Sequence, residues 1–102
     1  EHSLINARML ARRSYENVFW IYDVDTHTIS FGSAYQFTLP VNVRLELTYA
    51  DALPQPGIMF YSDGGSSGGQ VQIEHEYGQD RYDVDWILGL VKKEDEVGEK
   101  GP

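Results

Sequence analysis

The sequence contains no cysteine, which excludes both a disulfide scaffold and a thiolate site. It also lacks any apolar run approaching the roughly 18–20 residues that a transmembrane helix needs. Basic residues are few: 8 Lys and Arg stand against 16 Asp and Glu, giving a formal net charge of −8. Binding to nucleic-acid phosphates requires clustered Lys and Arg, so we do not expect a general nucleic-acid binder.

The sequence does contain enough apolar and aromatic material for a folded domain. Its 102 residues are 41% hydrophobic and 13% aromatic, which is not the composition of a disordered chain. The 7 tyrosines and many β-branched residues favour strands. We therefore expect a single globular domain over residues 1–91 and a charged, disordered tail over residues 92–102.

Residues 4–16 are expected to form the one helix. Leu4, Ala7 and Ala11 recur at the spacing of one helical face, and no Gly or Pro interrupts them. Ser3 can serve as the N-cap. A helix this short is marginal in isolation, so it must pack against the rest of the chain.

Basic charge is concentrated on this predicted helix. Arg8, Arg12 and Arg13 supply three of the eight basic residues, whereas the segment from residue 14 to residue 91 is mainly acidic. The three arginines form either a solvated stripe or a contact surface for an acidic neighbour. Within an assembled filament, the contact surface is the favoured interpretation.

Period-2 alternation and turn signals predict a series of short strands after the helix. The predicted strands cover residues 18–22, 28–31, 35–39, 43–48, 58–61, 71–74, 81–86 and 88–91. Strands following one helix predict an α+β fold in which an N-terminal helix packs on a two-sheet antiparallel β-sandwich. Trp20 and Trp86 are expected to be core anchors.

A glycine-serine segment separates two of the predicted strands. Gly64, Gly65, Ser66, Ser67, Gly68 and Gly69 read GGSSGG. Such residues enter left-handed backbone regions at little steric cost, so we expect a turn. The apolar run before this segment and the alternating run after it predict a β-hairpin.

The same segment matches the G-x-S-x-G pattern of hydrolases around Ser66. A helix should follow such a nucleophile, but a strand-like segment follows here. The histidines that a hydrolase would use, His27 and His75, lie in turn-like and strand-like segments without a supporting motif. No lysine or helix follows the glycines, so a phosphate loop is not expected either. We predict no catalytic residues and no cofactor.

Two pairs of alternating aspartates are considered as possible calcium-binding sites. The pair Asp23 and Asp25 begins like a calcium loop, but Thr28 and Ala34 replace the glycine and glutamate that the motif requires. The pair Asp83 and Asp85 can offer two carboxylates on one strand face. We expect no metal site, with a weak calcium site at either pair left open.

The last third of the chain resembles a known family. An aromatic strand is followed by D-G-x-S-S-G-G, an alternating strand and Y-x-V-D-W-x-x-G-x-V, as in the C-terminal half of the H-type minor pseudopilins of type II secretion, the GspH/FimT-like family. The matching residues are Phe60, Asp63, Gly64, Ser66, Ser67, Gly68, Gly69, Tyr82, Val84, Asp85, Trp86, Gly89 and Val91.

The resemblance implies the same helix-and-two-sheet fold and a non-enzymatic structural subunit. It implies a periplasmic domain, anchored in the inner membrane by a hydrophobic helix preceding Glu1; the missing initiator Met suggests a processed or truncated piece. The subunit would join the I, J and K minor pseudopilins and the major pseudopilin near the tip of the pseudopilus. There it would assist protein export across the outer membrane.

Two alternatives belong to other functional classes. FimT-like minor pilins of type IV pili use basic residues near the C-terminus for DNA uptake, but here Lys92 and Lys93 are followed at once by three acids. DNA binding is therefore not expected. A small secreted β-sandwich binding module could instead use the glycine-serine segment and Pro54-Gln55-Pro56 as recognition loops.

Overall fold

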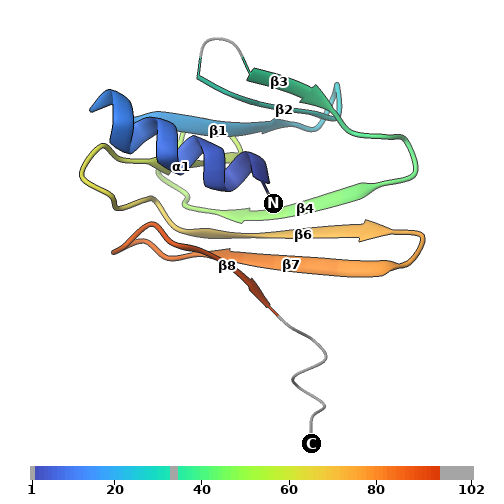
Figure 1. Cartoon of the computed structure of the whole chain (residues 1–102). Helices are drawn as coiled ribbons and strands as arrows, with labels where there is room; N and C mark the ends of the chain where they lie inside the picture. The colour runs from blue at the N-terminus through green and yellow to red at the C-terminus, as the bar shows by residue number, and fades with distance from the viewer. Residues whose placement is uncertain (1, 33–34, 95–102) are drawn as a thin grey trace, which may run out of the picture.

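The computed structural model describes residues 2–32 and 35–94, which form one helix and eight strands (Figure 1). The elements are α1 (His2–Ser14), β1 (Val18–Asp23), β2 (Thr28–Phe31), β3 (Tyr35–Thr38), β4 (Arg44–Tyr49), β5 (Gly57–Phe60), β6 (Gly69–His75), β7 (Gly78–Val84) and β8 (Val91–Glu94). The strands make two four-stranded antiparallel sheets, ordered β3-β2-β1-β5 and β4-β6-β7-β8. The predicted α+β class is confirmed.

Both sheets contribute to one hydrophobic core. Along β1 the side chains of Val18, Trp20 and Tyr22 are buried, because alternate residues of a strand point to the same face. The second sheet adds buried side chains from β6 and β7, namely Val71, Tyr82 and Val84. Trp20 is 1% exposed, so the prediction that it anchors the core is confirmed.

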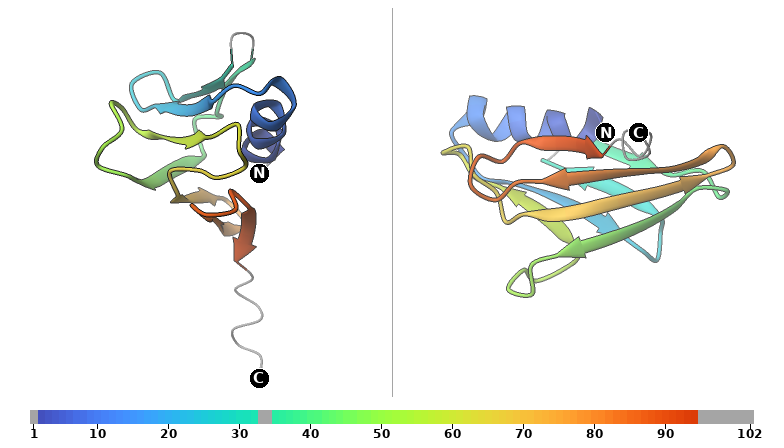
Figure 2. Two further views of the ribbon diagram at one scale, coloured as in Figure 1. Left: turned by 90° about the vertical axis from the view of Figure 1, so that its left-hand side faces the viewer. Right: turned by 90° about the horizontal axis from the view of Figure 1, so that it is seen from below.

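Helix α1 lies along one side of the sheets and packs on β1 and β5 (Figure 2). Leu4, Ala7 and Ala11 are buried, as their spacing predicts, and the two alanines allow the helix backbone to approach the sheet closely. The Trp20 indole N–H donates to the Ser3 hydroxyl at 3.0 Å. Ser3 lies inside the helix, which begins at His2, so the N-cap prediction is wrong.

The predicted hairpin across the glycine-serine segment is also wrong. β5 belongs to the first sheet and β6 to the second, so the segment is a crossover between sheets. It starts after a tight turn, in which the Gly64 amide donates to the Tyr61 carbonyl at 3.0 Å and the Tyr61 amide donates to the Gly65 carbonyl at 2.9 Å. The chain enters the second sheet at Gly69, which has φ 153°. A Cβ on Gly69 would lie 2.7 Å from the Thr48 carbonyl oxygen, so the close approach requires glycine.

The C-terminal strands differ from the prediction as well. β7 begins at Gly78, three residues before the predicted strand, and ends at Val84 before it reaches Trp86. β8 includes residues 92–94, which the prediction placed in the disordered tail, while residues 95–102 lie outside the described residues. Trp86 is 66% exposed, so its prediction as a core anchor is wrong. The helix of the described region is too short to cross a membrane.

Candidate functional site

Two segments that are distant in the sequence meet at one end of the sheets. They are the glycine-serine segment (residues 64–69) and the loop that joins β7 to β8 (residues 85–90, hereafter the 85–90 loop). The Ser66 amide donates to the Trp86 carbonyl at 3.0 Å. The Ser66 hydroxyl donates to the Asp85 carbonyl and accepts from the Gly68 amide, both at 2.9 Å. Ser66 is buried, so these bonds fix the loop on the glycine-serine segment.

The 85–90 loop is a single helical turn with its own caps. The Gly89 amide donates to the Asp85 carbonyl at 2.8 Å, the spacing of an α-turn. The Asp85 carboxylate accepts from the Leu88 amide at 2.6 Å, as an N-cap side chain does. Gly89 then adopts φ 67°, the left-handed conformation that ends a helix. These bonds therefore hold the loop without any contribution from its apolar side chains.

Glycines allow the two segments to approach at backbone distance. A Cβ on Gly89 would lie 2.2 Å from the Gly64 carbonyl oxygen. A Cβ on Gly65 would lie 3.1 Å from the Trp86 carbonyl oxygen, and one on Gly68 would lie 3.2 Å from the Trp86 Cβ. The glycine-serine segment and the 85–90 loop, which both belong to the sequence resemblance, thus form one structural unit.

This unit presents apolar side chains to solvent. Within the loop, Trp86 is 66%, Ile87 61%, Leu88 58% and Leu90 48% exposed. Elsewhere, helix α1 also exposes Met9 and Ile5. Clustered exposed apolar side chains are typical of surfaces that contact other molecules.

Two of the three arginines of α1, Arg8 and Arg12, lie beside this loop. The Arg8 guanidinium donates to the Leu88 carbonyl at 3.4 Å, and its Nε is buried without a hydrogen-bond partner among the described residues. Arg12 and Arg13 are exposed. Within residues 2–32 and 35–94, no carboxylate forms an ion pair with any of the three arginines.

Arg8 and Arg12, but not Arg13, line a hollow of about 200 Å³ between α1 and the loop. Its other lining residues are Asp63, Gly64, Ile87, Leu88 and Leu90. Asp63 offsets one of the two positive charges, and its carboxylate already accepts from the Gly65 amide at 3.0 Å. The hollow therefore suits a partner that brings both a carboxylate and an apolar side chain. We call it the Arg8 hollow.

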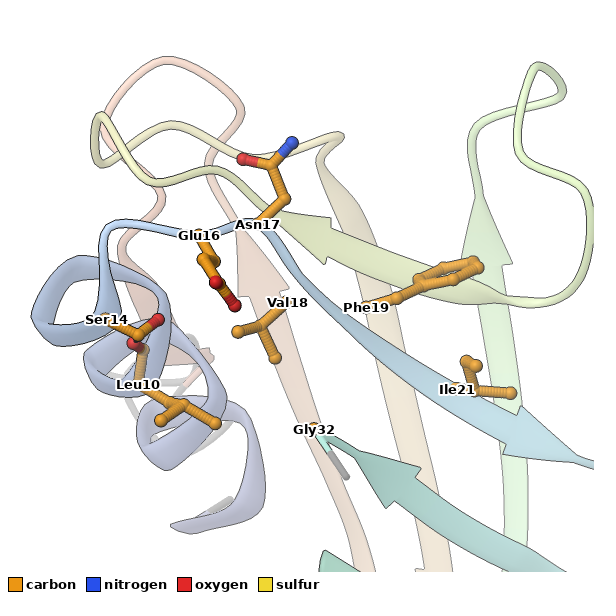
Figure 3. A pocket seen from close by; sticks show the side chains of 8 residues that line it. All are labelled: Leu10, Ser14, Glu16, Asn17, Val18, Phe19, Ile21 and Gly32. Carbon is orange, nitrogen blue, oxygen red and sulfur yellow. The ribbon is translucent and has the colours of Figure 1, made fainter. Parts of the chain in front are cut away.

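A larger hollow of about 500 Å³ lies on the other side of α1 (Figure 3). Leu10 and Ser14 face it from the helix, with Val18 and Gly32 opposite. The Ser14 hydroxyl donates to the Leu10 carbonyl at 2.7 Å, so it is already used within the helix. Nothing in this lining indicates catalytic chemistry.

The hydroxyl of Ser66 is used for structure. Both of its hydrogen bonds go to backbone groups, and the side chain is buried. His27 and His75 bond elsewhere: the His27 ring contacts Tyr22 and Val43, and the His75 ring contacts Asp80. The turn interpretation of the glycine-serine segment is thus the one that its geometry supports.

Three of the four aspartates considered for calcium accept hydrogen bonds from neighbouring protein groups through their carboxylates. Asp23 accepts from the Asp25 amide at 2.9 Å, and Asp83 accepts from the Gln70 side chain at 2.8 Å. Asp85 caps the 85–90 loop. Among the described residues, no group of three or more potential metal ligands is present.

His27 ties the β1–β2 turn to the segment before β4. Because the Val43 carbonyl can only accept, His27 Nε2 donates to it, at 2.7 Å. In the neutral ring, Nδ1 then accepts from the Tyr22 hydroxyl at 2.8 Å. Burial, with a smaller effect of the Asp23 carboxylate, raises the pKa of Tyr22 above its usual 10.0.

Comparison with solved structures finds a protein of the same fold. The minor pseudopilin EpsH from the type 2 secretion system of Vibrio cholerae aligns with a TM-score of 0.71 and 18% sequence identity, over 93% of this chain and 90% of that chain. The chain has the fold of a minor pseudopilin. No protein-family model matches the sequence, and no curated protein matches it. At the level of the fold, the resemblance seen in the sequence is confirmed.

The minor pseudopilin fold brings together three features that the sequence singled out separately: the arginines of α1, the glycine-serine segment and Trp86. The exposed loop around Trp86 was missed, because residues 81–86 and 88–91 were predicted to be strands. The sequence does contain a pattern that indicates this loop: Asp85, a typical N-cap residue, and Gly89, a typical C-cap glycine, lie four positions apart. We call the exposed loop side chains, together with the Arg8 hollow, the assembly surface.

Proposed function

We propose that this chain is a non-enzymatic structural subunit, the periplasmic domain of a minor pseudopilin of a type II secretion system. The observation that carries the proposal is the minor pseudopilin fold over 93% of the chain. The subunit is anchored in the inner membrane by a hydrophobic helix that continues α1 toward the N-terminus. Its task is to join a pseudopilus that helps to push folded proteins across the outer membrane.

The assembly surface supports this role. Its apolar side chains extend from a turn that backbone hydrogen bonds close, so the backbone that displays them to solvent is held in place. A preorganised apolar patch beside two arginines suits contact with another subunit. The I, J and K minor pseudopilins and the major pseudopilin are the proposed partners, near the pseudopilus tip.

The type IV pilus alternative has less support. Lys92 and Lys93, the basic residues that it would use, lie on β8. Lys93 is 3.6 Å from the Asp80 carboxylate, so part of its charge is compensated. We therefore propose no nucleic-acid partner.

Export is the experiment that tests the proposed role. Removing the gene from its organism should leave folded export substrates in the periplasm, and restoring the wild-type gene should release them. Outer-membrane assembly and general growth serve as controls. Unchanged export in the deletion strain would count against a secretion role.

A further inference from the structure

The β1–β2 turn has the features of a ligand for the Arg8 hollow. Asp23, Val24 and Asp25 are exposed, with Val24 70% exposed between the two carboxylates. From the sequence we expected no metal site at this Asp-x-Asp pair and left a weak calcium site open. Among the described residues, no group of three or more potential metal ligands forms there. The turn instead presents one apolar side chain flanked by two acids.

This turn is also held in shape. The Asp23 carboxylate accepts from the amides of Asp25 at 2.9 Å and Thr26 at 3.4 Å, which closes the turn. The His27 ring then ties the base of the turn to the Val43 carbonyl at 2.7 Å. A turn held in this way loses little conformational entropy when it docks.

The turn and the Arg8 hollow are complementary in charge and polarity. The hollow has two guanidiniums and one carboxylate, together with Ile87, Leu88 and Leu90. The turn brings two carboxylates and a valine. Arg8 and Arg12 have no ion-pair partner in the described parts of the chain, so docking would supply one.

The two features lie at opposite ends of the molecule. Val18, at one end of β1, pairs with Phe60 near the glycine-serine segment, whereas Asp23, at the other end, leads into the β1–β2 turn. Figure 1 shows that turn at the end of the sheets opposite the connections from β5 to β6 and from β7 to β8. A molecule therefore cannot fill its own hollow, but a second copy displaced along the strands can.

We propose that the Arg8 hollow binds the Asp23–Asp25 turn of a second copy of this chain, so that copies associate head to tail. Carboxylates of the turn pair with Arg8 and Arg12, and Val24 contacts the apolar side of the hollow. The contact uses different surfaces on the two copies, so it can repeat into a chain. The proposal rests on the assembly role above and names one partner for that surface.

Sedimentation velocity of the purified chain with α1 intact tests this over a range of concentrations and salt. We expect concentration-dependent self-association that weakens as salt rises. Arg12→Glu and Asp25→Arg should each lower the association constant about tenfold or more. Mixing the two variants should give one-to-one dimers, because the hollow of one and the turn of the other are both intact.

Matched controls carry the same charge changes at exposed positions outside the contact. Arg13→Glu lies on the same helix but does not line the hollow, and Asp51→Arg lies in the loop after β4, outside both the β1–β2 turn and the lining of the hollow. Both should associate like the wild type. A wild-type chain that stays monomeric, or controls that weaken association equally, would overturn the proposal. If the monomeric chain still binds other pseudopilins, the head-to-tail contact is wrong and the assembly role stands.

Discussion

Gly89 packs directly on the backbone of Gly64, so closely that a Cβ on Gly89 would lie 2.2 Å from the Gly64 carbonyl oxygen. Gly89 also adopts φ 67°, where side chains are disfavoured. This contact joins the glycine-serine segment to the 85–90 loop. It explains why each segment has a glycine at the point of contact although the two are distant in the sequence.

We expect Gly89→Ala to lower the free energy of unfolding by about 3 kcal/mol or more, because a steric clash adds to the cost of a strained φ. Gly78→Ala is the control: Gly78 also has a positive φ of 137°, but a Cβ there meets nothing within 4 Å. It should cost only about 1–2 kcal/mol. Urea unfolding of both variants measures the difference, and equal losses would contradict the proposed packing.

Ser66 should matter for stability. Ser66→Ala removes the donor to the Asp85 carbonyl and leaves the Gly68 amide without its partner. The expected loss is about 1–3 kcal/mol in the free energy of unfolding, because both bonds are shielded from water. Ser66→Thr keeps the hydroxyl and serves as a comparison for the hydrogen bonds. A Ser66→Ala variant as stable as the wild type would argue against this structural role.

The two tryptophans should differ sharply in their access to solvent. In a Trp20→Phe variant the remaining Trp86 fluorescence should be quenched strongly by acrylamide and emit at long wavelength. In a Trp86→Phe variant the remaining Trp20, 1% exposed, should be protected. Similar quenching in the two variants would mean that the 85–90 loop is folded into the core.

Much of the fold follows from local patterns. The spacing of Leu4, Ala7 and Ala11 identified the buried face of α1, and alternation identified most strands, because both patterns depend only on which residues face the core. The strands that pair with β5 and β6 could not be predicted from these local patterns. A hairpin and a crossover between sheets need the same glycines, and only tertiary contacts such as that of Gly69 with Thr48 distinguish them.

The candidate site was predictable in its parts but not as a whole. Arg8 and the glycine-serine segment were recognised separately, because no sequence pattern reports that they meet. Trp86 was misplaced because a large aromatic residue after an alternating strand is usually buried. Here Asp85 and Gly89 cap a turn that carries Trp86 out to solvent.

Tyr22 gives a prediction for alkaline pH. Its pKa is raised in the folded state by burial and by Asp23, so the unfolded chain releases this proton first. The stability linked to Tyr22 is complete below about pH 10 and is lost as the pH rises toward the folded-state pKa. Unfolding free energies above pH 10 should therefore fall more steeply for wild type than for Tyr22→Phe. Parallel pH profiles would contradict the prediction.

At neutral pH the same variant tests the bond between Tyr22 and His27. Tyr22→Phe removes the hydroxyl that donates to His27 Nδ1 at 2.8 Å. The expected loss is about 1 kcal/mol in the free energy of unfolding. Phe37→Tyr, which adds a hydroxyl at an exposed position of β3, should change stability little and controls for the chemistry of the substitution.

The central claim is that the assembly surface binds other pseudopilins, and co-purification tests it most directly. The membrane-anchored protein is captured in the presence of the I, J and K minor pseudopilins and the major pseudopilin of its organism. We expect at least one partner to be retained, and Ile87→Ser with Leu88→Ser to reduce its recovery about tenfold. Val41→Ser, at a 98% exposed residue before β4, should not reduce it. Recovery of no pseudopilin by the intact protein, or equal recovery by all variants, would contradict the claim.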